Sequence, residues 1–197
     1  MKKTENSVVM ILVTGGCRSG KSSYAQMLAE RIYTGKKESG KWLFVATCQA
    51  DDAEMAERVA RHQADRSSQW HTLEEPLHVA DAINNASDIR GDTAPDGYDV
   101  ILVDCLTLWV SNLMADGRTD TQIFEEADRL IAAINATSTP VILVTNEVGC
   151  GIVPSHPMSR RFRDIQGTVN QKIAAAASTV VWMVSGIPVK INDVRKN

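Results

Sequence analysis

Short runs of apolar, mostly β-branched residues recur along the chain and alternate with longer segments of helical periodicity. The apolar runs are largely continuous, which is typical of strands buried on both faces of a parallel sheet. The segments between them place apolar residues on one stripe, as amphipathic helices do. Strands are predicted at residues 8–13, 42–47, 100–104, 141–145 and 179–184, and helices at 21–33, 52–65, 75–86, 119–136 and 160–177.

Alternating strands and helices predict an α/β fold, with a mostly parallel central sheet flanked by helices. A shorter helix is predicted after Asp104, and a short added C-terminal strand at 187–191, after the Ser185-Gly186 turn. The chain length of 197 residues fits one domain, 1–197, in which residues 1–9 are a possible N-terminal extension.

Small or polar residues stand at the carboxyl ends of the predicted strands. Open α/β sheets bind ligands outside these ends, so this pattern predicts a ligand crevice there. The residues concerned are Gly15, Thr47, Asp104, Asn146 with Glu147, and Ser185.

The strongest chemical signal is a phosphate-loop motif that follows the first strand and opens the first helix. The segment matches G-x-x-x-x-G-K-[ST], whose backbone N–H groups cradle phosphates at a helix N-terminus. Lys21 is expected to reach the β- and γ-phosphates, and Ser22 to place its hydroxyl on Mg²⁺. Asp104, at the end of a strand, is expected to help hold the same ion. The motif comprises Gly15, Gly16, Cys17, Arg18, Ser19, Gly20, Lys21 and Ser22.

Composition excludes several other classes of protein. The net charge is −3 and there is no basic block, which argues against a nucleic-acid binder. No apolar run approaches the roughly 20 residues that span a bilayer, so no membrane span is predicted. The four cysteines, Cys17, Cys48, Cys105 and Cys150, have neither CxxC nor zinc-ligand spacing, which favours a reducing, cytoplasmic compartment.

The predicted helix at 52–65 has an unusual stripe. At 3.6 residues per turn, Met55, Val59, His62 and Arg66 share one face, which therefore turns polar toward its end. On position alone, His62 is either a satisfied, half-buried histidine or a nucleophile or acid/base group facing the phosphates. Trp70, after this helix, is expected to pack in the core, and Glu74 to accept hydrogen bonds from a base or ribose.

These motifs, in this order, resemble the bifunctional adenosylcobinamide kinase / adenosylcobinamide-phosphate guanylyltransferases of cobalamin biosynthesis. The resemblance runs from about Met10 to Asn192. It rests on ILVTGG at 11–16 with the phosphate loop, VAT at 45–47, DAEM at 52–55, RVARH at 58–62, WHTLE at 70–74, DCLTLWV at 104–110, TNEVG at 145–149, RFRD at 161–164, NQ at 170–171 and SG at 185–186.

The resemblance implies a transferase with two activities and a RecA-like P-loop fold. Such enzymes phosphorylate adenosylcobinamide with ATP or GTP, then transfer GMP from GTP to the new phosphate through a guanylylated histidine and release pyrophosphate. The matching histidine is His62, which would make His62 and Lys21 the catalytic residues. Family members form homotrimers with the site near a subunit boundary.

The resemblance also implies a set of nucleotide contacts beyond the phosphate loop. Cys17 stands where alanine is common in the family, and Ser67 where proline is often found; neither change removes a group that the chemistry needs. The implied contacts are Ala46, Thr47, Cys48, Gln63, Ala64, Asp65, Arg66, Glu74 and Asp104.

Three other functions remain to be weighed against this one. A plain P-loop small-molecule kinase would leave His62 structural and form no nucleotidyl-protein. A regulatory GTPase would be expected to contain an Asn-Lys-x-Asp motif that selects the guanine base, and this sequence lacks that motif. A RecA-type nucleic-acid motor is disfavoured by the acidic balance of charges.

Overall fold

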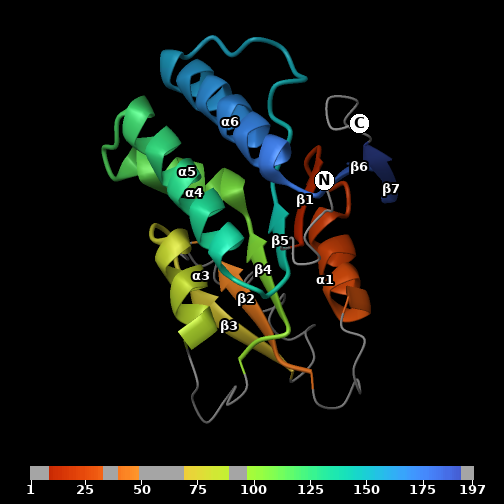
Figure 1. Ribbon diagram of the computed structural model, residues 1–197. Coiled ribbons are helices and arrows are strands. Elements are labelled where there is room, and N and C mark those ends of the chain that lie inside the picture. Colours follow the sequence, from red (N-terminus) through yellow and green to blue (C-terminus); the bar gives the residue numbers. More distant parts are fainter. Residues whose placement is uncertain (1–8, 33–39, 49–68, 89–96, 192–197) are drawn as a thin grey trace, which may run out of the picture.

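The computed structural model describes residues 9–32, 40–48, 69–88 and 97–191, and its centre is a seven-stranded sheet. The strand order is β3-β2-β4-β5-β1-β6-β7 (Figure 1). All pairs are parallel except β6 with β7, which is antiparallel. The strands are β1 (Met10–Gly15), β2 (Trp42–Ala46), β3 (Trp70–Glu74), β4 (Val100–Asp104), β5 (Val141–Val144), β6 (Thr179–Val184) and β7 (Ile187–Ile191).

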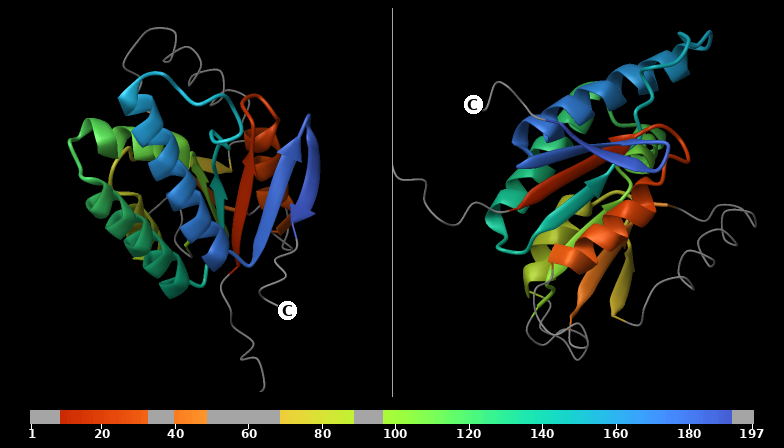
Figure 2. Two further views of the ribbon diagram at one scale, coloured as in Figure 1. Left: turned by 90° about the horizontal axis from the view of Figure 1, so that it is seen from above. Right: turned by 90° about the vertical axis from the view of Figure 1, so that its right-hand side faces the viewer.

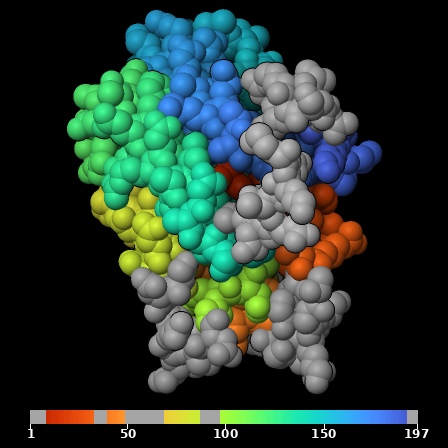
Figure 3. Space-filling model, in the orientation of Figure 1, coloured from red at the N-terminus to blue at the C-terminus, as the bar shows by residue number. Residues whose placement is uncertain are grey.

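Helices cover both faces of the sheet, which confirms the predicted α/β class (Figure 2). Helix α1 packs on one face, and the other described helices form a layer on the opposite face. Figure 3 shows α3, α5 and α6 side by side in that layer. The helices are α1 (Lys21–Ile32), α3 (Val79–Asp88), α4 (Leu106–Ala115), α5 (Asp120–Ala136) and α6 (Pro157–Ala176).

The central strands divide their side chains between two buried layers. In β1, Met10 and Leu12 join the cluster beneath α3 to α6, whereas Ile11 and Val13 join the cluster beneath α1. Both layers are apolar because both faces of the sheet are covered. This explains why the strands appear in the sequence as continuous rather than alternating apolar runs.

One strand, β3, was not predicted from the sequence. It pairs in parallel with β2 at the edge of the sheet, and its residues alternate between more buried and more exposed positions. A half-exposed edge strand of five residues has no continuous apolar run to reveal it. Trp70 is buried and packs against Trp42 and Phe44, as predicted for a core residue.

Local side-chain hydrogen bonds set where two helices begin. Helix α3 begins at Val79, four residues later than predicted, because the Glu75 carboxylate accepts bonds from the backbone N–H groups of Leu77 and His78. Helix α6 begins at Pro157, three residues earlier than predicted, and His156 Nδ1 accepts from the Met158 N–H. Proline suits the first turn of a helix, where its missing N–H costs nothing.

The predicted helix at 52–65 lies outside the described residues. None of the helices that the structure describes is both long and apolar enough to cross a membrane.

Candidate functional site

The carboxyl ends of the six parallel strands meet at one edge of the sheet. Parallel register places Ala46 beside Asp104, and Asp104 beside Val144. The next strand, β1, ends at Gly15, where the phosphate-loop motif begins. The structure therefore gathers at one edge the predicted site residues that follow β1, β2 and β4.

The phosphate loop turns sharply between β1 and α1. Arg18 and Gly20 have φ angles of 53° and 88°, in the region that favours glycine. Inside the loop, the Ser19 N–H donates to the Gly16 carbonyl at 3.3 Å. Helix α1 then begins at Lys21, so its unpaired N-terminal N–H groups belong to the end of the loop.

Two neighbouring strands fix the position of this loop. The Glu147 N–H, just beyond β5, donates to the Gly15 carbonyl at 3.0 Å, and the Gly186 N–H donates to the Ser19 carbonyl at 3.1 Å. Gly15 also lies against β6, since a Cβ at this position would come within 2.6 Å of the Met183 carbonyl oxygen. The loop is thus attached on both sides, to the ends of β5 and β6.

Lys21 lies beneath the loop with only 7% of its surface exposed. Its ammonium group donates to the Gly16 carbonyl and lies 3.4 Å from Ser19 Oγ. Burial lowers the pKa of Lys21, while Cys105, Cys17 and Asp104 oppose that shift. A phosphate group would supply the strong negative partner that this poorly solvated cation lacks.

Asp104 lies near this ammonium group, and Ser22 follows Lys21 in the chain. Val100 and Leu102 of β4 pack in the cluster beneath α1, and strand alternation puts Asp104 on the same face. Ser22 is in the first turn of α1. A carboxylate and a hydroxyl are oxygen donors of the kind that Mg²⁺ prefers, usually with phosphate and water as its other ligands. In the part of the chain that the structure describes, no group of three or more His, Cys, Asp or Glu side chains is arranged so that it could hold a metal ion.

The hydroxyl of Thr47, a predicted nucleotide contact, makes hydrogen bonds within the protein. Its Oγ1 donates to the Cys105 carbonyl and accepts from the Cys105 N–H, both at 2.7 Å. Asn112 of α4 donates to the Thr47 carbonyl at 2.8 Å. These bonds join the end of β2 to the residue after Asp104, so they position the Asp104 carboxylate. This role of Asn112 was not predicted from the sequence.

The other predicted contacts fall into two groups. Ala46 is buried at the end of β2, Cys48 is half-buried, and Glu74 is exposed at the end of β3, opposite Ala46. The second group cannot be placed relative to the phosphate loop, because its members lie outside the described residues: His62, Gln63, Ala64, Asp65 and Arg66.

A buried polar network on the opposite face of the sheet was not predicted from the sequence. Thr145 Oγ1 donates to Asn170 Oδ1 at 2.8 Å, and Gln166 Nε2 lies 3.0 Å from Thr145 Oγ1 and 2.8 Å from Asn170 Oδ1. Thr107 Oγ1 lies 3.4 Å from Thr145 Oγ1. The sequence feature that could have revealed this network is the spacing of Gln166 and Asn170, two amide side chains four residues apart on the inward-facing stripe of α6.

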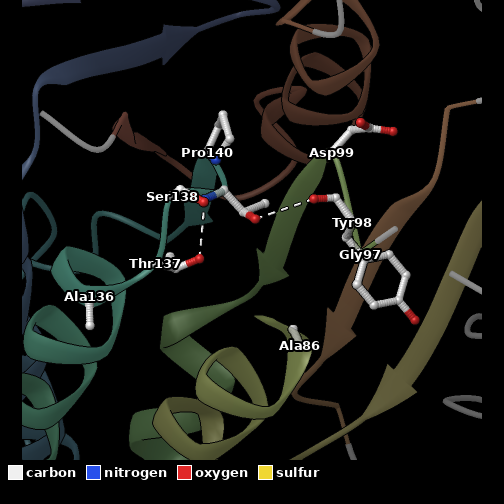
Figure 4. Close-up of a pocket in the computed structure, with 9 residues that line it drawn as sticks. Ala86, Gly97, Tyr98, Asp99, Ala136, Thr137, Ser138 and Pro140 are labelled. Carbon is white, nitrogen blue, oxygen red and sulfur yellow. Dashed lines mark hydrogen bonds between the residues drawn. The ribbon is translucent and has the colours of Figure 1, made fainter. Parts of the chain in front are cut away.

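A cavity of about 400 Å³ lies away from the phosphate loop (Figure 4). It opens where β4 and β5 begin, at the amino edge of the sheet, and Thr139 Oγ1 donates there to the Tyr98 carbonyl at 3.3 Å. It contains no predicted site residue. Its lining is Ala86, Gly97, Tyr98, Asp99, Ala136, Thr137, Ser138, Thr139 and Pro140.

Comparison with known proteins gives one family match across nearly the whole chain. The family model described as cobinamide kinase / cobinamide phosphate guanyltransferase matches residues 11–191. The bifunctional adenosylcobalamin biosynthesis protein CobU of Escherichia coli is 42% identical over 93% of this chain and 99% of its own length, and that of Salmonella typhimurium is 43% identical over the same shares. The Pseudomonas aeruginosa protein CobP is 38% identical over 91% of this chain and 95% of its own length.

Solved structures with a similar fold have low sequence identity. A KaiC-like protein from Pyrococcus horikoshii aligns with a TM-score of 0.52 at 16% identity, covering 89% of this chain and 71% of that one. The ATPase domain of G40P aligns with a TM-score of 0.51 at 11% identity, covering 88% and 68%. These similarities support the P-loop NTPase fold alone.

The packing of Gly15 against β6 predicts different effects for two adjacent substitutions. Gly15→Ala should lower the free energy of unfolding by about 1–3 kcal/mol, since its methyl group would meet the Met183 carbonyl and Ser19 Oγ. Gly16→Ala meets no heavy atom within 4 Å and should change stability by no more than about 0.5 kcal/mol. Chemical denaturation followed by circular dichroism measures both values. Equal stability of the two variants would contradict the packing described here.

The cysteines should differ sharply in reactivity. Burial raises the pKa of Cys105 to about 11, assisted by the Asp104 charge, so about one thiol in a thousand is ionised at pH 8. Cys17 and Cys150 are exposed. Brief treatment of the native protein with N-ethylmaleimide at pH 8 should label Cys17 and Cys150 and leave Cys105 unmodified, as measured by peptide mass analysis. Labelling of Cys105 as fast as Cys150 would contradict its burial.

Proposed function

Because the chain belongs to the cobinamide kinase / cobinamide phosphate guanyltransferase family, we propose that its single phosphate loop serves both reactions of that bifunctional enzyme. The enzyme phosphorylates cobinamide and then transfers a guanylyl group to cobinamide phosphate. The observation that best supports a shared site is Lys21, a buried cation beneath the loop with Asp104 on the same face. In our proposal the nucleotide also contacts Ala46, Thr47, Cys48 and Glu74, together with residues 63–66.

In the kinase step, a hydroxyl oxygen of adenosylcobinamide bonds to the γ-phosphorus of ATP or GTP. The bond from that phosphorus to the β–γ bridging oxygen breaks, the nucleoside diphosphate leaves, and the hydroxyl gives up its proton. Backbone N–H groups of the loop hold the phosphate oxygens, and Lys21 stabilises the negative charge that develops on them. This step needs no protein nucleophile.

In the guanylyl step, a ring nitrogen of His62 attacks the α-phosphorus of GTP and pyrophosphate leaves. A phosphate oxygen of cobinamide phosphate then attacks the guanylylated histidine, which releases the imidazole and forms adenosyl-GDP-cobinamide. Covalent catalysis divides one difficult displacement into two easier ones. In this step Lys21 binds the β- and γ-phosphates, which form the leaving group. In the kinase step it binds the γ-phosphate, which is the group being transferred.

Mg²⁺ is the proposed cofactor, held by Asp104 and Ser22. When bound, the ion neutralises phosphate charge during both transfers. Asp104 is suited to this role because the Thr47 hydroxyl and the Cys105 backbone fix the end of its strand.

We also propose a homotrimer. The hairpin of β6 and β7 exposes an apolar face, on which Trp182 pairs with Val189 and Val184 with Ile187. A patch of this kind on one sheet face supports self-association. The four cysteines are free thiols, which supports the proposed cytoplasmic location.

His62→Ala should abolish guanylyl transfer, by about 10³-fold or more, while part of the kinase activity remains. Wild-type protein incubated with GTP labelled at the α-phosphate, and with Mg²⁺, should keep a label that is stable in alkali and lost in mild acid, as a phosphoramidate is. The variant should keep none. His78→Ala, at an exposed histidine, is the matched control and should label normally. Equal labelling of His62→Ala, or an alkali-labile label on the wild type, would contradict His62 as the nucleophile, and a wild-type protein that keeps no label would favour a plain kinase.

Asp104→Asn should raise the Mg²⁺ concentration needed for half-maximal kinase activity by about 10- to 100-fold. The change removes one negative charge and keeps the side-chain volume, so the fold should remain intact. Asp128→Asn, at an exposed aspartate of α5 that pairs with Lys172, is the control. An unchanged Mg²⁺ titration of Asp104→Asn would assign this carboxylate a structural role.

A further inference from the structure

The buried polar network between β5 and α6 has no part in the chemistry described so far. Thr145 and Gln166 are fully buried, and their polar atoms bond to each other and to Asn170. Desolvating these groups is costly, and Gln166 Oε1 has no hydrogen-bond partner in the described structure. A network of this kind rigidifies the backbone that it holds. Here that backbone is the segment immediately after β5.

Three hydrogen bonds fix the main chain around Asn146. Its N–H donates to Thr107 Oγ1 at 2.7 Å, and its carbonyl accepts from Asn170 Nδ2 at 3.1 Å. The next residue, Glu147, donates its N–H to the Gly15 carbonyl at 3.0 Å. Asn146 is therefore attached both to the polar network and to the first residue of the phosphate loop.

Strand alternation places the side chain of Asn146 on the α1 face of the sheet. The Thr145 side chain points to α6, whereas Ile142 and Val144 pack in the cluster beneath α1. The parallel ladder continues past β5, through the bonds from Thr145 N to the Val13 carbonyl and from Glu147 N to the Gly15 carbonyl. Asn146 thus continues the row of Ile142 and Val144.

The strands on either side of β5 carry the phosphate-handling groups. Asp104 ends β4 on the same α1 face, and β1 leads into the loop that covers Lys21. Asn146 therefore lies between the proposed metal-binding carboxylate and the phosphate loop. Its side chain is half-buried, and its side-chain amide makes no hydrogen bond to any described residue.

We propose that Asn146 binds the terminal phosphate of the nucleoside triphosphate by donating a hydrogen bond from its side-chain amide. This inference rests on the proposed function of the phosphate loop and adds a contact specific to the third phosphate. In the kinase step the contact holds the group being transferred, and in the guanylyl step it holds the distal part of the leaving pyrophosphate. Thr107 and Asn170 are positioning residues, which act through the Asn146 backbone.

The contact predicts that Asn146 distinguishes a triphosphate from a diphosphate. Binding of GDP and of the β,γ-imido analogue of GTP to the full chain can be measured by calorimetry with Mg²⁺ and without corrinoid. Asn146→Ala should weaken binding of the analogue by about 10- to 100-fold, as expected for a hydrogen bond to a charged group, and leave GDP binding within about twofold. Asn146→Asp should weaken binding of the analogue further, because the substitution places a negative charge beside the phosphate.

Control variants separate this contact from general damage. Asn135→Ala, at an exposed asparagine of α5, should bind both nucleotides as the wild type does. Asn170→Ala should reduce preference for the triphosphate in the same direction as Asn146→Ala, whereas loss of stability alone would affect both nucleotides equally. Unchanged or equally weakened binding of both nucleotides to Asn146→Ala would overturn the proposal, as would an Asn146→Asp variant that binds the analogue normally. Failure of the wild-type protein to bind either nucleotide would instead contradict the proposed function.

Discussion

The buried ammonium group of Lys21 is the constraint on which the rest of the site depends. A lysine that is 7% exposed has lost most of its hydration, which is why its pKa is lowered. The loop compensates in part with the Gly16 carbonyl, and Asp104 adds a negative charge nearby. A carbonyl dipole is a weaker partner for a cation than a phosphate, so the loop is prepared for an anionic ligand.

Keeping that cation in place requires a rigid support, which the parallel sheet provides by separating two tasks between its faces. Side chains on the α1 face, such as Asp104, point toward the phosphate loop. Side chains on the opposite face, such as Thr145, bond to buried amides of α6. Alternation along a strand allows one short segment to serve both tasks, since adjacent residues point in opposite directions. The Thr47 hydroxyl adds a bond between β2 and the residue after Asp104.

The features that the sequence revealed are those with a strong local pattern. The phosphate loop is a contiguous motif, and the central strands are continuous apolar runs, so both could be located before the structure was known. Strand β3 escaped prediction because one of its faces is exposed. Gln166 and Asn112 escaped because a buried amide in a helix looks like a surface amide in the sequence, and only the fold shows its partners. The family resemblance supplied the role proposed for His62, which periodicity alone left undecided.

The central claim is that one phosphate site performs both transfers, and Lys21→Ala tests it most directly. Kinase activity is measured as phosphorylation of cobinamide, and guanylyl transfer as conversion of separately supplied cobinamide phosphate to GDP-cobinamide, so that neither assay depends on the other. A shared site predicts that both rates fall together, on the order of 10³-fold or more, in a variant that remains folded. Loss of one activity with the other near its wild-type rate would contradict the shared site.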